Sequence, residues 1–237
     1  MPKGRLILIP TTLGADTINQ CLVPALKETI STLTEFIVEN EKSARKFLKE
    51  AQIATPQQQL IIREYAKHNK DELPQYFKSI EEGRDVGLLS EAGCPAIADP
   101  GSEIVLEAHR RNINVVPYVG ANSIILALMS SGFNGQSFKF SGYLPIDRTD
   151  RNTRLIQLET ESSKSNMSQI FIETPFRNNR MLQDLVVTLQ PDTLLCIAAG
   201  ITTPEQLIQT KKVSAWKKLL PELHKIPAVF IIYSGKR

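Results

Sequence analysis

The sequence predicts an α/β protein built from two α/β domains with mostly parallel sheets. Short apolar, β-branched runs alternate with longer amphipathic stretches along all 237 residues. Several of the short runs are apolar on both faces, as strands buried in a largely parallel sheet must be. Hydrophobic residues make up 42% of the chain and charged residues 22%, which is the balance of a globular protein with a sizeable core.

The predicted elements alternate in chain order, with helices expected to cover the faces of the sheets. The strand candidates span residues 6–10, 36–39, 86–90, 115–119, 138–141, 170–173, 194–198 and 228–233. Amphipathic stretches predict helices that include residues 44–49, 102–111, 123–129 and 177–189. Gly120 follows one strand candidate and opens a fresh helix, so we place the boundary near residue 118, giving domains 1–118 and 119–237.

The composition excludes several classes of protein. Cys21, Cys94 and Cys196 stand far apart without a CxxC pair, which argues against a zinc site or disulfide scaffold and favours the reducing cytoplasm. No histidines are paired at ligand spacing, so we expect no metal. No apolar run approaches the ~18 residues of a membrane span, so no membrane association is expected. The net charge of +3 permits contact with RNA without requiring it.

Three loops rich in glycine and small residues follow three of the strand candidates. They cover residues 11–16, 91–101 and 120–123. In α/β sheets, ligands bind beyond the carboxyl ends of the strands, where small side chains let a ligand approach the backbone closely. Asp99 in the second loop and Asn122 or Ser123 in the third could equally cap the helices that follow. We expect the three loops to form the floor of a binding site.

These segments resemble the tetrapyrrole methylase superfamily of S-adenosylmethionine-dependent enzymes. The strongest match is LLSEAGCPAIADPG at residues 88–101, against "valvSDAGtPlisDPG" in the family that methylates a ribose 2′-hydroxyl of a cytidine in small-subunit rRNA. PTTLG at 10–14 is similar to that family's "PTPIGN", and ETPFR at 173–177 to its "ESPhR". The matches run in order over most of the chain, so the chain is identified as a divergent member.

The resemblance implies a cofactor cleft between two α/β domains, S-adenosylmethionine as cofactor, small-subunit rRNA as partner, and a homodimer. The residues it places on the cofactor are Pro10, Thr12, Gly14, Ser90, Glu91, Ala92, Gly93, Ala121 and Ser123.

The chain departs from the family pattern at three places. The family's "EDTR" is Glu39-Asn40-Glu41-Lys42 here, its "SDAG" acid survives only as Glu91, and its "RELTK" is AGITT at 199–203. His68-Asn69 keeps the family's "HN". These departures leave two alternatives open, namely methylation of a tetrapyrrole precursor on carbon and a non-catalytic paralogue that only binds the cofactor.

Methyl transfer from a sulfonium is an in-line displacement, so alignment of the nucleophile should supply much of the acceleration. A ribose hydroxyl is a weak nucleophile, and a nearby base would help. Glu39 is the first candidate, followed by Glu91 and Glu173, although each could instead be a structural partner of a cation. Lys42 and Arg45 on a basic helix, and Arg177 beside Phe176, are candidate RNA contacts or simply solvated residues.

Overall fold

The computed structural model describes residues 2–65 and 73–235 and divides the chain into two compact units, Met1–Asn122 and Ser123–Arg237. The last strand of the first unit ends at Pro117 and the first helix of the second begins at Ser123. The boundary that we placed near residue 118 falls in this connection.

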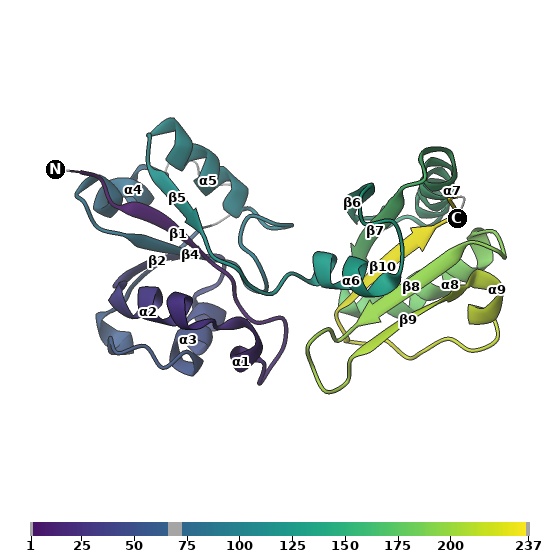
Figure 1. The fold of residues 1–237 in the computed structure, drawn as a ribbon, viewed down its shortest axis with the longest axis horizontal. Helices are drawn as coiled ribbons and strands as arrows, with labels where there is room; N and C mark the ends of the chain where they lie inside the picture. Colours follow the sequence, from purple (N-terminus) through teal and green to yellow (C-terminus); the bar gives the residue numbers. More distant parts are fainter. Residues whose placement is uncertain (1, 66–72, 236–237) are drawn as a thin grey trace. The chain divides into compact units, whose positions relative to one another are not determined.

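The first unit contains a parallel sheet of five strands in the order β3-β2-β4-β1-β5 (Figure 1). The strands are β1 (Arg5–Ile9), β2 (Glu35–Val38), β3 (Ile61–Glu64), β4 (Val86–Leu89) and β5 (Asn114–Pro117). β2 and β4 are buried at every residue, which confirms the expectation from their continuous apolar runs. β3 was missed because it is a short edge strand whose residues are all at least partly exposed.

Helices cover both faces of this sheet. They are α1 (Ile18–Cys21), α2 (Pro24–Thr32), α3 (Glu41–Glu50), α4 (Leu73–Glu81) and α5 (Gly101–Arg110), with a 3-10 turn η1 (Gln57–Gln59). One core cluster joins the sheet to α1, α2 and α3, and a second joins the opposite face to α4 and α5. This two-sided burial is what an all-parallel sheet requires.

The second unit also follows the α/β plan, but its sheet is mixed. Its elements are α6 (Ser123–Ser131), β6 (Phe138–Tyr143), α7 (Arg148–Ser165), β7 (Ser168–Glu173), η3 (Pro175–Arg177), α8 (Asn178–Thr188), β8 (Leu194–Ala199), β9 (Leu207–Lys212), α9 (Val213–Trp216) and β10 (Ala228–Tyr233). The strand order is β6-β7-β10-β8-β9.

The prediction of a mostly parallel sheet is wrong for this second unit. Only β6 and β7 run parallel, and the other three pairs are antiparallel. Residues 200–206 are all that join β8 to β9, whereas a parallel crossover needs a dozen or more residues. β9 itself was missed because its sequence, LIQTKK, is polar and partly exposed at the edge of the sheet.

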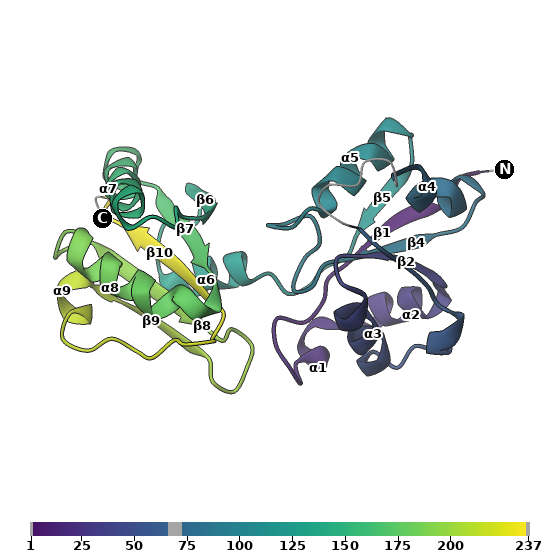
Figure 2. The same cartoon turned by 180° about the vertical axis from the view of Figure 1, so that it is seen from behind.

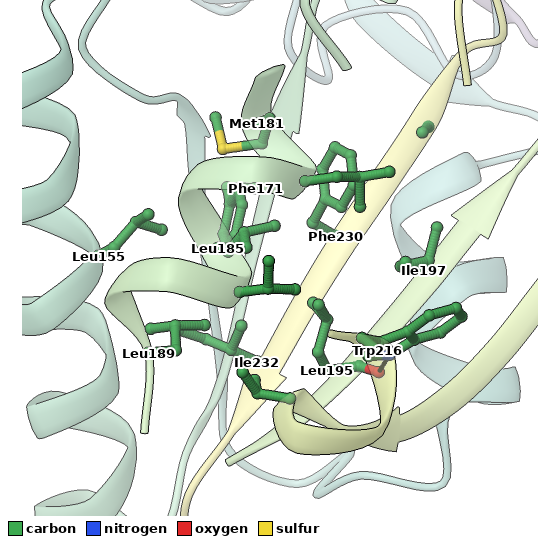
Figure 3. Close-up of a cluster of buried hydrophobic side chains, with 14 of the residues drawn as sticks. Leu155, Phe171, Met181, Leu185, Leu189, Leu195, Ile197, Trp216, Phe230 and Ile232 are labelled. Atoms are coloured by element: carbon green, nitrogen blue, oxygen red, sulfur yellow. Dashed lines mark hydrogen bonds between the residues drawn. The ribbon is translucent and has the colours of Figure 1, made fainter. Parts of the chain in front are cut away.

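The core of the second unit lies between the sheet and helices α7, α8 and α9 (Figure 3). Phe171 and Phe230 stack at its centre with ring centroids 5.8 Å apart. The indole of Trp216 is buried and donates to the carbonyl of Leu195 at 3.0 Å, so its one polar group is satisfied. Helix α6 packs on the other face, in front of the sheet in Figure 1 and behind it in Figure 2.

Helix α7 carries Arg148, Arg151 and Arg154, which recur at helical spacing. Arg148 and Arg151 both bind the buried carboxylate of Asp184 on α8, at 3.0 and 2.5 Å. Arg154 pairs with Glu161 at 3.2 Å on the same helix. Arg148 and Arg151 therefore hold α7 to α8, and Arg154 is paired within α7, so the three arginines do not form a free basic stripe. Within the described residues, no helix is both long enough and apolar enough to cross a membrane.

Candidate functional site

The parallel sheet of the first unit brings the loops after its strands to a single edge. The carboxyl ends of β1, β4 and β5 are neighbours in the sheet, and β2 lies on the other side of β4. The three small-residue loops that the sequence singled out therefore meet there. Tyr65 begins the segment after β3, and the matching pair His68-Asn69 lies outside the described residues.

The loops after β1 and β4 are tied together through the backbone. The amide of Thr11 donates to the carbonyl of Gly93 at 2.9 Å. The buried hydroxyl of Ser90 donates to the carbonyls of Gly93 and Ala92 at 3.2 and 3.3 Å, so it shapes its own loop. The conformation of both loops thus rests mainly on backbone groups and one small hydroxyl.

The loop after β5 packs directly on the other two. A Cβ atom at Gly120 would lie 2.2 Å from the Cβ of Pro10, so only glycine fits there. The thiol of Cys94 donates to the carbonyl of Ala121 at 3.3 Å. Gly93 has a φ of +77°, which a larger residue adopts only with strain. Sequence reasoning expected these glycines to admit a ligand, and it missed that two of them let the loops touch one another.

Glu39 connects β2 to the loop after β4. Its carboxylate accepts a hydrogen bond from the backbone amide of Glu91 at 2.8 Å, while its own amide donates to Leu89. Glu39 is half-buried and the side chain of Glu91 is exposed. The structure therefore places two of the three predicted acidic residues at this edge, joined through the backbone amide of Glu91.

Two further acidic groups, Asp99 and Tyr65, belong to the same region. The carboxylate of Asp99 accepts from the amides of Ala96 and Gly101 at 2.9 and 2.6 Å, and so stabilises the start of α5. Burial raises the pKa of Asp99, and the charge of Glu39 adds to the rise. Burial and the charges of Asp99 and Glu39 raise the pKa of Tyr65. Sequence reasoning did not find Tyr65, because one tyrosine after a short edge strand carries no signal.

The basic residues near Glu39 have different surroundings. Arg45 is held by the carboxylate of Glu41 at 2.7 Å and the carbonyl of Gln57 at 2.8 Å. Lys42 is exposed. Asn40 caps α3 by accepting from the amide of Ser43 at 3.0 Å, which an aspartate would also do. The change from the family's Asp to Asn therefore preserves the helix start.

Glu173 and Arg177 lie in the second unit and bind each other. The carboxylate of Glu173 is 2% exposed and accepts from Arg177 at 2.6 Å and from the amide of Thr174 at 2.6 Å. The sequence left open whether Glu173 acts in catalysis or is a structural partner of a cation. These contacts give it the structural role.

Ser123 is the first residue of α6. The turn at 199–203 closes on itself, with Thr203 bonded to the carbonyl of Gly200.

Several known proteins with similar sequences share one name. The chain is 34% identical over 188 residues to "Ribosomal RNA small subunit methyltransferase I" of Halalkalibacterium halodurans, covering 79% of this chain and 61% of that protein. It is 31% identical to the Synechocystis protein of that name, covering 84% of this chain and 67% of that protein. The Thermotoga maritima protein is 29% identical over 98% of this chain and 99% of its own length. No family model matches the chain.

Solved structures show the same fold at low sequence identity. Diphthine synthase has a TM-score of 0.67 and 13% identity, covering 97% of this chain and 89% of that one. The uroporphyrin-III C-methyltransferase of Thermus thermophilus, complexed with S-adenosyl homocysteine, has a TM-score of 0.58 and 15% identity, covering 98% of both chains. The chain has the tetrapyrrole methylase fold and belongs to the ribosomal RNA small subunit methyltransferase I family.

Proposed function

We propose that this protein is an S-adenosylmethionine-dependent methyltransferase that methylates a ribose 2′-hydroxyl of small-subunit rRNA. The observation that carries the proposal is its relationship to proteins named for rRNA methylation, at 31% identity over most of both chains. The bound S-adenosyl homocysteine of a structural neighbour supports the cofactor. The chain spans 61% of the length of one such relative, so the activity of the whole relative is part of the proposal.

The loops after β1, β4 and β5 meet at one edge of the first unit's sheet, which we call the loop edge. This edge suits a cofactor of this kind. Thr12, Gly14 and Ala121 are half-buried and Glu91 and Ala92 are exposed, so polar and backbone groups are accessible beside small side chains. We assign them to the cofactor together with Pro10, Ser90, Gly93 and Ser123, the remaining residues of the family pattern. Pro10, Ser90 and Gly93 are buried, so their role is to shape the loops.

The cofactor supplies a methyl group on a sulfonium, and the residues of the chain need only align the acceptor and remove a proton. Glu39 is our candidate base, because its carboxylate is held in place by the amide of Glu91 at the loop edge. Glu91 is the second candidate. Glu173 is tied to Arg177, and Arg45 to Glu41, so we assign both of these pairs to structure. Lys42 remains a candidate RNA contact.

The test is to map ribose 2′-O-methylation in small-subunit rRNA from a strain that lacks the gene. Loss of one methylated nucleotide, restored by the wild-type gene but not by Glu39→Gln, is the expected result. An unchanged methylation pattern would reject the rRNA substrate. Transfer of labelled methyl to uroporphyrinogen or a precorrin, with none to RNA, would favour the tetrapyrrole alternative, and no turnover on any acceptor would favour the binding paralogue.

The finer properties implied by the family are part of the same proposal. The enzyme works in the cytoplasm as a homodimer. Sedimentation equilibrium of the purified protein tests the assembly, and a monomer at all concentrations would reject it.

A further inference from the structure

An exposed aromatic side chain marks a surface of the second unit that the proposed methyl-transfer site does not use. Phe176, in η3 after β7, is 70% exposed. The imidazole of His224 meets it edge-on, with ring centroids 5.9 Å apart and planes at 76°. The ammonium of Lys225 lies over the Phe176 ring, 6.0 Å from its centroid. We call these three residues the aromatic platform.

Single exposed hydrophobic residues are ordinary on protein surfaces and need no explanation. The aromatic platform differs because two segments distant in sequence are fastened together to build it. The amide of Lys225 donates to the carbonyl of Pro175 at 3.1 Å. The buried side chain of Asn178 donates to the carbonyl of Ile226 at 2.6 Å. These bonds hold His224 and Lys225 beside Phe176.

A second pair of contacts fixes the loop before Lys225. The side chain of Asn179 accepts from the amide of Leu223 at 2.8 Å and donates to Glu222. The carboxylate of Glu222 also accepts from the amide of His224 at 2.9 Å. Glu222, an acid beside the aromatic platform, is therefore engaged in hydrogen bonds to Asn179 and His224. The neighbouring Arg177 is engaged by Glu173, so we do not count it in the aromatic platform.

We propose that Phe176, His224 and Lys225 form a stacking platform for an unpaired base of the RNA substrate. The proposal rests on the proposed function for the identity of the polymer. An aromatic ring and an imidazole are groups on which unpaired RNA bases stack, and the lysine ammonium beside them attracts the nearby phosphate backbone. A prearranged surface also loses little side-chain freedom when a base binds.

The experiment compares two tryptophan variants, Phe176→Trp and Leu219→Trp, titrated with a single-stranded RNA of about ten nucleotides. Leu219 is 77% exposed in the same unit and serves as the matched control. Trp216, the one native tryptophan, is buried and gives a constant background. We expect RNA to quench the fluorescence of Phe176→Trp in a saturable way and to leave Leu219→Trp unchanged. Equal response of the two variants would overturn the platform.

Affinity measurements separate stacking from simple apolar contact. Phe176→Leu and Phe176→Ala should weaken RNA binding by about 5-fold or more, whereas Phe176→Tyr should keep it, because only the last retains a ring. Binding of S-adenosylhomocysteine, measured by calorimetry, should be the same in all three and shows that each is folded. Wild-type affinity for RNA in Phe176→Leu would reject the platform.

The outcomes also separate this inference from the proposed function. If wild-type protein binds and methylates RNA while the Phe176 variants behave identically to it, the platform fails alone. If wild-type protein neither binds nor methylates RNA, the proposed function fails and the platform with it.

Discussion

The carboxylate of Glu39 accepts a hydrogen bond from the backbone amide of Glu91 at 2.8 Å, which fastens the end of β2 to the loop after β4. The first acid belongs to the segment that departs from its family's "EDTR", and the second stands at the position of the aspartate in the family's "SDAG". The two substituted motifs are therefore in direct contact. This contact gives Glu39 a fixed position from which it could take a proton.

Replacing Glu39 tests that role without removing the contact. Glu39→Gln keeps an oxygen that can accept from the amide of Glu91 but loses the basic carboxylate. We expect single-turnover methylation of small ribosomal subunits to fall by about 10²- to 10⁴-fold, the range for loss of a general base. Affinity for S-adenosylhomocysteine, measured by calorimetry, should stay near the wild-type value. Full methylation activity in this variant would show that Glu39 is not the base.

Gly120 provides a test of the contact between loops. In Gly120→Ala the new methyl group would lie 2.2 Å from the Cβ of Pro10, so the loops must separate. We expect a loss of about 1–3 kcal/mol in the free energy of unfolding, as for other overpacked sites, together with weaker cofactor binding. Urea denaturation measures the first quantity. Gly135→Ala is the control because its Cβ would meet nothing within 4 Å, and an equal effect there would contradict the loop contact.

The raised pKa of Asp99 predicts a specific dependence of stability on pH. Burial is the main cause of the rise, so the folded state holds the Asp99 proton more tightly than the unfolded state does. This contribution to stability is fully present below the ordinary aspartate pKa and is lost as the pH rises through the raised value. Asp99→Asn keeps an oxygen acceptor for Ala96 and Gly101. We therefore expect the unfolding free energy of wild type to fall relative to Asp99→Asn as pH increases.

Asp192 supplies a control of opposite sign for that measurement. A hydrogen bond and the charge of Lys212 lower its pKa. The stability of wild type relative to Asp192→Asn should therefore fall as the pH is lowered through the depressed pKa. If the stability difference from wild type changed with pH in the same direction for both variants, one of the two assignments would be contradicted.

Among the ion pairs of the described residues, that of Arg151 and Asp184 should be the most costly to break. Their side chains are 3% and 2% exposed and lie 2.5 Å apart. Arg151→Met leaves the buried carboxylate of Asp184 with only the partly exposed Arg148, and we expect a loss of about 3–5 kcal/mol in the free energy of unfolding. The double variant Arg151→Met with Asp184→Leu should recover much of this.

Arg154→Met is the matched control on the same helix. Its pair with Glu161 is partly exposed, so the expected loss is below about 1 kcal/mol. Urea denaturation measures the free energy of unfolding of the three variants. Equal losses of unfolding free energy in Arg151→Met and Arg154→Met would contradict the burial that we assign to the Arg151 pair.

The sequence predicted the strands that bury both faces and the edge strands β5 and β6, and it missed the edge strands β3 and β9. β2 and β4 are recognisable because their short, mostly apolar sequences are those of fully buried strands, whereas β9 has only two apolar residues followed by four polar ones and lies at a sheet edge. The antiparallel course of β8 and β9 depends on a short turn that no periodicity reveals. At the candidate site, the loops were predicted from their small residues. Tyr65 and the contact between Pro10 and Gly120 were not, because both depend on which strands become neighbours. The roles of the nine cofactor residues stay predictions.

The loop edge of the first unit owes its form chiefly to main-chain groups, such as the amide of Thr11 on the carbonyl of Gly93. Main-chain groups do not mutate, so the geometry of such an edge is inherited even while side chains drift. Positions 12, 91 and 92 can then exchange residues at small cost to folding, and selection can explore new acceptors on an unchanged frame. Diphthine synthase, uroporphyrin-III C-methyltransferase and this chain have one architecture at 13–15% identity, which is the outcome that such a separation allows.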